Sequence, residues 1–380
     1  MQTYALDRSA ARPLLNIVTI FLATQVPALR AIFKYFPAPL ITGSLFLLIA
    51  LPGIVLVLNP PEVFRGFMQS RWPAALVAAA MAVASVTVYP YADALKWQGR
   101  GSDADDALIA AGQALWRFEN PYVQTTYLGN SFTPGPGWAL LVSPFSITGL
   151  YRFFLPATLA MAIWRLRAAR YAWQDINKFL LLLASSLCVW ELIAEGGDYL
   201  PFALLTLCAL LGLKTASIGR PHVAMLTALL GALATFRLPF LLLPALIGFS
   251  LLSSFPRRAV FVSCCATAIC LFLHAPFLAI TGRDYPPLNL LLTKAEGSFS
   301  AAEFILAVSV CIILGLTMIV NWRGWQSLTH VACGLGVPWS IVSAAELASA
   351  GSFADWGGAG YFAMWLPFVI LAVTVPRTGA

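Results

Sequence analysis

The chain has 380 residues, of which 60% are hydrophobic and only 10% are charged, and its mean hydropathy is +0.81. Soluble domains are closer to half apolar and a quarter charged, so this composition excludes an ordinary soluble protein and favours a polytopic membrane protein. The net charge of +7 does not imply a nucleic-acid partner, because excess Lys and Arg usually line the cytoplasmic loops of membrane proteins.

Apolar segments long enough to cross a bilayer fill most of the chain. A spanning helix needs about 20 mostly apolar residues, with a working range of about 17–25. We therefore expect an all-α, polytopic fold with about 11–12 spans, in a single integral-membrane domain covering residues 1–380. The fourth segment is broken by Pro144, Gly149 and Pro156, which is compatible with a span joined to a surface-lying piece. In chain order the candidates are 14–29, 38–58, 74–92, 136–164, 179–194, 199–214, 222–236, 238–255, 259–280, 300–320, 327–348 and 359–376.

The charges predict the orientation of these segments. If the N-terminus is cytoplasmic and every segment crosses, most of the 23 basic residues lie in short cytoplasmic loops, as the positive-inside rule expects. Most of the 16 acids then fall on or near the outer side. We expect a multi-pass protein of the plasma (inner) membrane, with its chemistry on the extracytoplasmic face. The outer segments are 93–135, 195–198, 281–299 and 349–358.

The largest outer segment contains the sequence SDADDALIAAGQALWRFENPY at residues 102–122. Ser102 or Asp103 can cap a helix, and acids in the first turn suit its positive end. The pattern predicts an interfacial helix from about residue 104 to 118, ended by Pro121. Its apolar face comprises Ala107, Ala111, Ala114, Leu115 and Phe118.

The three carboxylates of this motif allow two interpretations. As structural groups, Asp103, Asp105 and Asp106 cap and stabilise the helix. As functional groups, three carboxylates beside low-dielectric lipid repel one another and raise the pKa of at least one. A carboxylate with a raised pKa is what a general base near neutral pH requires.

The motif resembles the first outer loop of the GT-C class of integral-membrane glycosyltransferases, in particular the family 87 mannosyltransferase type. The family's aspartate matches Asp103, Asp105 or Asp106, and the end of its surface helix matches Glu119, Asn120, Pro121 and Tyr122. A Pro-rich return matches residues 132–137. Weaker matches are Arg237 followed by Pro239, and the polar-then-apolar segment 196–213. The resemblance covers about residues 75–260.

This resemblance implies transfer of a mannose- or arabinose-like sugar, with inversion, from a polyprenyl phosphate donor to an extracytoplasmic glycolipid or glycan. An aspartate would act as general base on the acceptor hydroxyl, and a cation would stabilise the leaving phosphate. No cofactor is certain, and a divalent cation held by the three acids is left open. The candidate phosphate-binding residues are Arg237, Arg283 and Lys294, with Arg117, Lys96 and Arg100 as further outer cations, and the candidate sugar- or acceptor-binding residues are Glu191, Glu195, Asp198, His274 and Tyr122.

A membrane transporter or flippase of a lipid-linked or small polar substrate is the alternative. Transporters place charged residues and broken helices near the membrane midplane, often in two repeated halves. In this chain the acids gather at one interface and no internal repeat is visible, which favours the transferase. Glu346, within the eleventh span, is a further intramembrane acid of interest.

Overall fold

The computed structural model describes residues 8–96, 102–215, 219–289 and 327–374, with side chains from residue 13 onward. In these ranges the chain is helical, and its single antiparallel bridge joins Thr125 to Ser131. The first part comprises α1 (Arg8–Gln25), α2 (Ala28–Tyr35), α3 (Pro39–Leu58), α4 (Glu62–Gln69), α5 (Trp72–Val83), the π-helix η1 (Ala84–Val88), α6 (Tyr89–Ala94), α7 (Ala104–Trp116), η3 (Pro121–Val123), α8 (Pro136–Ile147), η4 (Tyr151–Phe153) and α9 (Phe154–Ala168).

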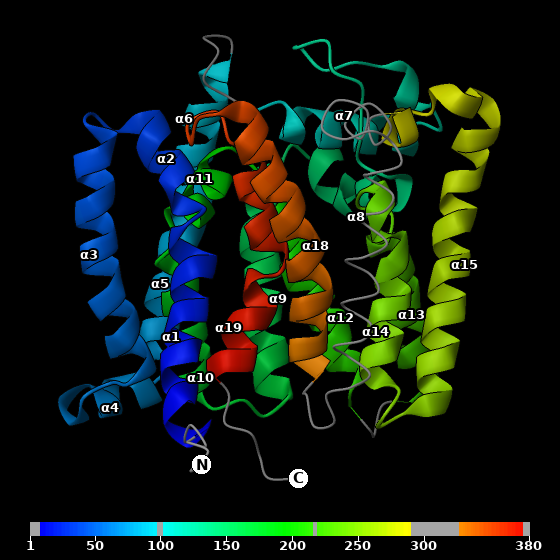
Figure 1. The fold of residues 1–380 in the computed structure, drawn as a ribbon. Coiled ribbons are helices and arrows are strands. Elements are labelled where there is room, and N and C mark those ends of the chain that lie inside the picture. The colour runs from blue at the N-terminus through cyan, green and yellow to red at the C-terminus, as the bar shows by residue number, and fades with distance from the viewer. Residues whose placement is uncertain (1–7, 97–101, 216–218, 290–326, 375–380) are drawn as a thin grey trace, which may run out of the picture.

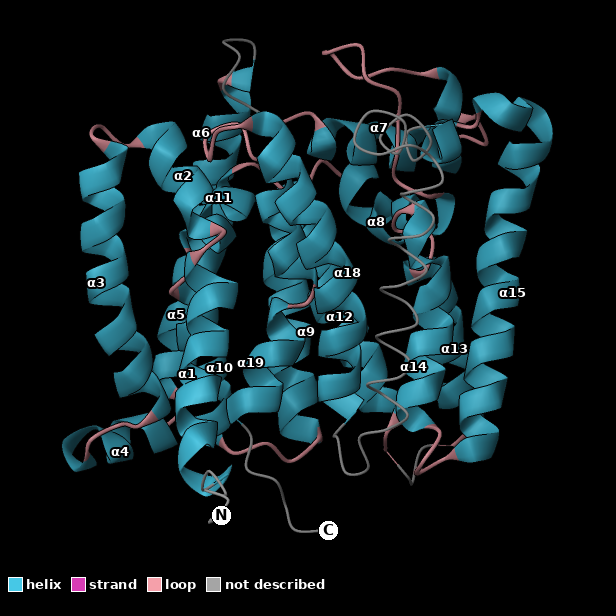
Figure 2. Ribbon diagram, viewed as in Figure 1, coloured by secondary structure: helices cyan, strands magenta, loops and turns pink. Residues whose placement is uncertain are grey.

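The second part comprises α10 (Trp173–Ala184), α11 (Leu187–Ala194), α12 (Tyr199–Leu213), α13 (Arg220–Leu233), η5 (Leu238–Leu242), α14 (Leu243–Leu251), α15 (Pro256–Thr281), η6 (Gly282–Asp284), α18 (Ser327–Ala350), η7 (Gly357–Met364) and α19 (Leu366–Thr374). Figure 2 shows these helices packed side by side as one bundle.

The prediction of a polytopic helical membrane protein is confirmed. Five helical segments are long and apolar enough to cross a membrane, and three bent pairs raise the number to eight within the described residues. Two shorter apolar helical segments, Tyr199–Leu213 and Leu238–Leu251, lie among them. The predicted span 300–320 lies outside the described residues.

The bundle has two distinct ends (Figure 1). The start of α1, the end of α19 and the short helix α4 lie at one end, which we call the terminal end. Helices α6 and α7 lie at the opposite end, which we call the α7 end. The predicted outer segment 93–135 therefore begins at the end of the bundle opposite to the start of α1 and the end of α19.

The predicted break in segment 136–164 is present. Helices α8 and α9 meet at an angle of 112°, and the chain turns at Gly149. Helices α10 and α11 bend by 74°, and η7 and α19 by 45°. These bends leave the short pieces α8 and α11 near the α7 end of the bundle (Figure 1).

Helix α7 covers most of the predicted helix 104–118, but one residue of the predicted apolar face, Phe118, lies outside it. It runs from Ala104 to Trp116, and Asn120 before Pro121 is extended as predicted. It packs on α8, where Gly112 lies against Ser143 and Ser146, and Ala107, Leu108, Ala111 and Ala114 are buried. The prediction for Phe118 was wrong, because the helix ends at Trp116 and Phe118 has a left-handed φ of 58° that leaves it 99% exposed.

Close backbone contacts hold the loop after α7 against the bundle. A Cβ atom at Gly135 would overlap the carbonyl oxygen of Thr235, so only glycine allows this approach. The Trp138 amide donates to Thr235 Oγ1 at 2.8 Å. Beneath the loop, the fully buried Trp138 packs against Phe202 and Phe236. This aromatic core fixes the start of α8 relative to α12 and α13.

Candidate functional site

Asp105 is the most buried of the three motif acids. It lies in the first turn of α7 and is 1% exposed. Tyr89 Oη donates a hydrogen bond to Asp105 Oδ2 at 2.7 Å, whereas the buried Oδ1 has no hydrogen-bond partner. Burial raises the pKa of Asp105 to about 7, and the charges of Asp106 and Asp93 add to this rise. The prediction that one carboxyl pKa is raised is thus confirmed, although burial contributes more than repulsion between the acids.

Asp103 has a different environment. It precedes the first residue of α7, but its side chain caps no helix amide. Its Oδ2 instead accepts hydrogen bonds from Thr126 Oγ1 at 2.6 Å and Asn130 Nδ2 at 2.7 Å. The helix start is completed by Ser102, whose Oγ accepts from the Ala104 amide at 3.2 Å. Asp103 therefore anchors the turn at residues 126–130 to the start of α7.

Asp106 belongs to an ion cluster with Asp93 and Lys96. Lys96 Nζ lies 2.7 Å from Asp106 Oδ1 and 3.0 Å from Asp93 Oδ1. Burial alone would lower the pKa of Lys96, but the hydrogen bonds to Asp106 and Asp93 raise it above its ordinary value. One oxygen from each of Asp93, Asp105 and Asp106 lies within 4.8 Å of the others. Carboxylate oxygens at this spacing are potential ligands of a hard divalent cation, but a lysine ammonium already sits among them.

Tyr89 connects Asp105 to a small cleft. The π-helix η1 immediately precedes Tyr89, and π-bulges are frequent at functional sites. Tyr89 lines a small cleft together with Tyr151, Arg152 and Gly196. Tyr151 Oη donates to the Gly196 carbonyl at 2.8 Å, and the Tyr89 and Tyr151 rings lie 5.8 Å apart. A Cβ at Gly196, whose φ is +69°, would overlap the Tyr89 ring. The cleft wall therefore depends on the glycine of the predicted outer segment 195–198.

Arg237 and Asp198 form a second polar centre at the start of α12. Arg237 Nη2 lies 3.3 Å from Asp198 Oδ2, and Trp138 Nε1 donates to the same oxygen at 2.9 Å. The guanidinium also lies 4.4 Å from the centre of the Phe236 ring. Asp198 is 2% exposed, so its charge is balanced by Arg237 rather than by water. The structure thus joins a predicted phosphate-binding residue to a predicted sugar-binding residue.

The two polar centres are neighbours. The Tyr151 ring lies 5.8 Å from the ring of Tyr89, which donates to Asp105, and the Tyr151 hydroxyl donates to Gly196, which is close in the chain to Asp198. Tyr151, which lines the cleft, thus lies between the two centres.

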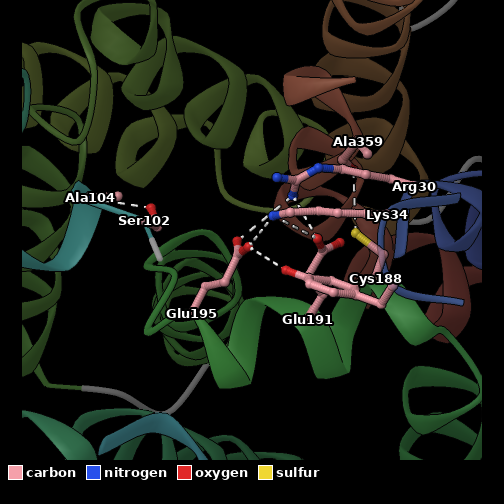
Figure 3. A network of polar contacts seen from close by, with 9 residues as sticks. Arg30, Lys34, Ser102, Ala104, Cys188, Glu191, Glu195 and Ala359 are labelled. Carbon is pink, nitrogen blue, oxygen red and sulfur yellow. Dashed lines mark hydrogen bonds and ion pairs between the residues drawn. The ribbon is translucent and has the colours of Figure 1, made fainter. Parts of the chain in front are cut away.

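Glu191 and Glu195 form an ion network with α2 (Figure 3). Arg30 Nη1 lies 3.2 Å from Glu191 Oε1, and Lys34 Nζ lies 2.8 Å from Glu195 Oε1. Longer contacts of 3.6 and 3.7 Å complete the square of charges. Two cations balance two anions, so this arrangement by itself explains both acids as a link between α2 and α11. Their predicted role in sugar binding has no further support in these contacts.

His274 and Tyr122 meet through Tyr285. His274 Nδ1 lies 2.6 Å from Tyr285 Oη, and the Tyr122 and Tyr285 ring centres are 4.9 Å apart. Tyr122 Oη donates to the Pro134 carbonyl at 3.0 Å. Burial raises the pKa of Tyr122 well above its ordinary value. This cluster packs the loop after α7 onto α15, and the contacts favour a structural role for both predicted residues.

The remaining predicted residues are dispersed. Arg283 is exposed in η6, and Arg117 pairs with Glu119 at 2.9 Å on the surface. Lys294 and Arg100 lie outside the described residues. Glu346 accepts a hydrogen bond from Tyr361 at 2.8 Å.

Sequence reasoning missed Asp93, Tyr89, Tyr151 and Arg152. Tyr89 lies at the end of the predicted span 74–92, where aromatic residues are typical of the membrane interface, and Asp93 is the first residue of the predicted outer segment 93–135. Arg152 lies inside the predicted fourth span, and an intramembrane arginine is a functional candidate by default. That signal was available in the sequence, but the proximity of these residues to Asp105 was not.

Comparisons with protein-family models, with curated proteins and with solved structures found no match to this chain.

Proposed function

We propose that this protein is a GT-C-like integral-membrane glycosyltransferase that uses a polyprenyl phosphate sugar donor. The observation that carries the proposal is Asp105, a buried carboxyl group with a pKa of about 7 on an interfacial helix at one end of the bundle. A lipid-linked donor keeps its tail in the bilayer, so its sugar must react close to the interface. The sugar would be mannose- or arabinose-like, and the acceptor a glycolipid or glycan.

Asp105 would be the general base, and Tyr89 would connect it to the acceptor. Tyr89 lines the cleft and donates to Asp105. An acceptor hydroxyl in the cleft would pass its proton to Tyr89 Oη while the Tyr89 proton moves to Asp105 Oδ2. The acceptor oxygen then bonds to the anomeric carbon, and the bond from that carbon to the phosphate oxygen breaks. The configuration inverts, and polyprenyl phosphate leaves with the electron pair. A positioned base of this kind contributes about 10²–10⁴-fold to the rate.

Two arginines are suited to the leaving phosphate. Arg237 is held by Asp198 and stacks on Phe236, so its position is fixed before substrate binds. Arg152 is exposed and lines the same cleft as Tyr89. Fixed cations placed where negative charge develops are among the strongest contributions to transfer reactions. We assign Arg152 to first contact with the donor and Arg237 to the phosphate in the transition state.

The direct test uses purified protein with synthetic polyprenyl phosphate sugars and membrane extracts as acceptor. We expect Asp105→Asn to lose at least about 10²-fold in transfer, while Asp103→Asn retains measurable transfer because Asp103 bonds only to a loop. Full transfer by Asp105→Asn would remove the base assignment. Cysteine labelling from outside intact cells should reach the loop at residues 126–130, because we place the α7 end outside the cytoplasm of an inner-membrane protein.

A transporter or flippase is the second candidate, and the bent helix pairs favour it. Discontinuous helices with a charged network near them are typical of substrate paths in transporters, and α10 and α11 bend by 74° next to the Arg30–Glu191 pair. Saturable flux of a lipid-linked sugar across liposomes, with no new glycosidic bond, would favour this function over transfer.

A further inference from the structure

The Lys96 ammonium group lies among the carboxylates of Asp93, Asp105 and Asp106. Its side chain is 13% exposed, and its Nζ contacts one oxygen of Asp93 and one of Asp106. The third acid, Asp105, is 1% exposed, and its Oδ1 has no hydrogen-bond partner. Lys96 lies just after the end of α6 at Ala94, whereas Asp105 and Asp106 lie in the first turn of α7. The ammonium group therefore joins two helices and also neutralises part of the cluster.

A divalent ion bound at this cluster would have to share its acids with Lys96. One oxygen of each of the three acids lies within 4.8 Å of the others, and hard divalent cations prefer such oxygen ligands. An ammonium 2.7 Å from Asp106 Oδ1 and 3.0 Å from Asp93 Oδ1 already occupies one oxygen of each of these two acids. Its positive charge would also repel an incoming cation at close range. The residues present therefore do not fit a resident divalent metal.

We propose that Lys96 is the built-in cation of this site, that it positions Asp106 and Asp93 around Asp105, and that it replaces a divalent metal. Wild-type protein then binds no metal at the cluster. Removing the ammonium leaves a compact set of carboxylates whose mutual repulsion a divalent ion relieves. Lys96 is a positioning residue in this account, because it touches the acids and not the reacting groups.

The experiment measures Mn²⁺ binding to purified full-length protein in nanodiscs, by loss of the free-ion electron paramagnetic resonance signal. Wild type and Lys96→Arg should bind no Mn²⁺ above the level of empty nanodiscs. Lys96→Met should bind one equivalent, with a dissociation constant of about 10⁻⁴–10⁻³ M, as in weak carboxylate sites. The double variant Lys96→Met with Asp106→Asn should lose this binding, which assigns it to the cluster.

Three results would overturn the proposal: Mn²⁺ bound by wild type, Mn²⁺ bound by Lys96→Arg, or no Mn²⁺ bound by folded Lys96→Met. Thermal unfolding checks that each variant is folded, and Lys96→Gln replaces Lys96→Met if the latter is not. Mn²⁺ bound by wild type or by Lys96→Arg would overturn the proposal even if both neutral variants misfold.

A second measurement rests on the proposed glycosyltransferase function. Chelation should leave wild-type sugar transfer unchanged, whereas Lys96→Met should lose transfer and regain part of it with added Mn²⁺. Wild-type transfer that stops on chelation and returns with Mg²⁺ would overturn the replacement of a metal by Lys96. A wild-type protein without any transfer would defeat the proposed function alone, because the Mn²⁺ measurements do not depend on it.

Discussion

Replacing Asp105 with asparagine should stabilise the folded protein above pH 7, although it removes the proposed base. The pKa of the Asp105 carboxyl group rises from 3.8 to about 7 on folding. Between these values the folded state binds the proton more tightly than the unfolded state does. Stability from this group is therefore complete below about pH 4 and is lost as the pH rises to about 7. Burial contributes most to the raised pKa of Asp105. Asp106 and Asp93 raise this pKa further, whereas Tyr89 and Lys96 lower it.

The size of the effect follows from the same pKa. At 1.36 kcal/mol per pH unit, the ionised carboxylate costs the folded state up to about 4 kcal/mol. An asparagine at position 105 can still accept from Tyr89 through its carbonyl oxygen, but its amide group replaces an oxygen without a partner. Burying that unpaired donor costs about 1–3 kcal/mol. We expect a net gain of about 1–3 kcal/mol at pH 8 and no gain at pH 4.

Thermal unfolding in nanodiscs between pH 5 and pH 8 measures this difference. The apparent unfolding temperature of Asp105→Asn relative to wild type should rise with pH by a few degrees, on the order expected for such free energies. Asp284→Asn is the matched control, because Asp284 is exposed, and its difference from wild type should stay constant. If Asp105→Asn loses stability with rising pH as steeply as wild type, the carboxyl group is not the one that titrates, and the reasoning is refuted.

Four other substitutions test separate parts of the structure. Tyr89→Phe removes the hydroxyl of the proposed relay and a hydrogen bond that favours the ionised base. Transfer should fall by on the order of 10²-fold, and the acid limb of the residual rate should move to higher pH; an unchanged transfer rate would exclude the relay. Gly135→Ala introduces a clash with backbone and should abolish folded protein in size-exclusion profiles, whereas Gly53→Ala, in open space within α3, should gain up to about 1 kcal/mol. Glu191→Ala leaves Arg30 without its nearest partner and should lower the free energy of unfolding by about 1–3 kcal/mol. If removing the Arg30 and Glu191 side chains together lowers it further than Glu191→Ala alone, this ion pair is not what couples α2 to α11.

The candidate site could be predicted in part, and the reasons differ by residue. The helix at 104–116 was predictable because a cap, acids in the first turn and a proline stop are local signals. The three acids, however, look equivalent in sequence. In the folded chain Asp103 bonds to Thr126 in the following loop, Asp106 pairs with Lys96, and Asp105 accepts from the buried Tyr89. These partners depend on the fold and cannot be read from the motif.

The sequence by itself determined that this chain is a helical membrane protein, and it predicted that the first apolar segment begins on the side opposite to the acidic helix. The length of the apolar segments predicts the helical spans, and the positions of the charged residues predict their orientation; both can be counted from the sequence. Only the tertiary structure decided which carboxyl group is buried, that Lys96 lies among the acids and that Arg237 is joined to Asp198. Burial and ion pairing depend on which helices pack together, because a carboxyl pKa is set by neighbours that are distant in the sequence.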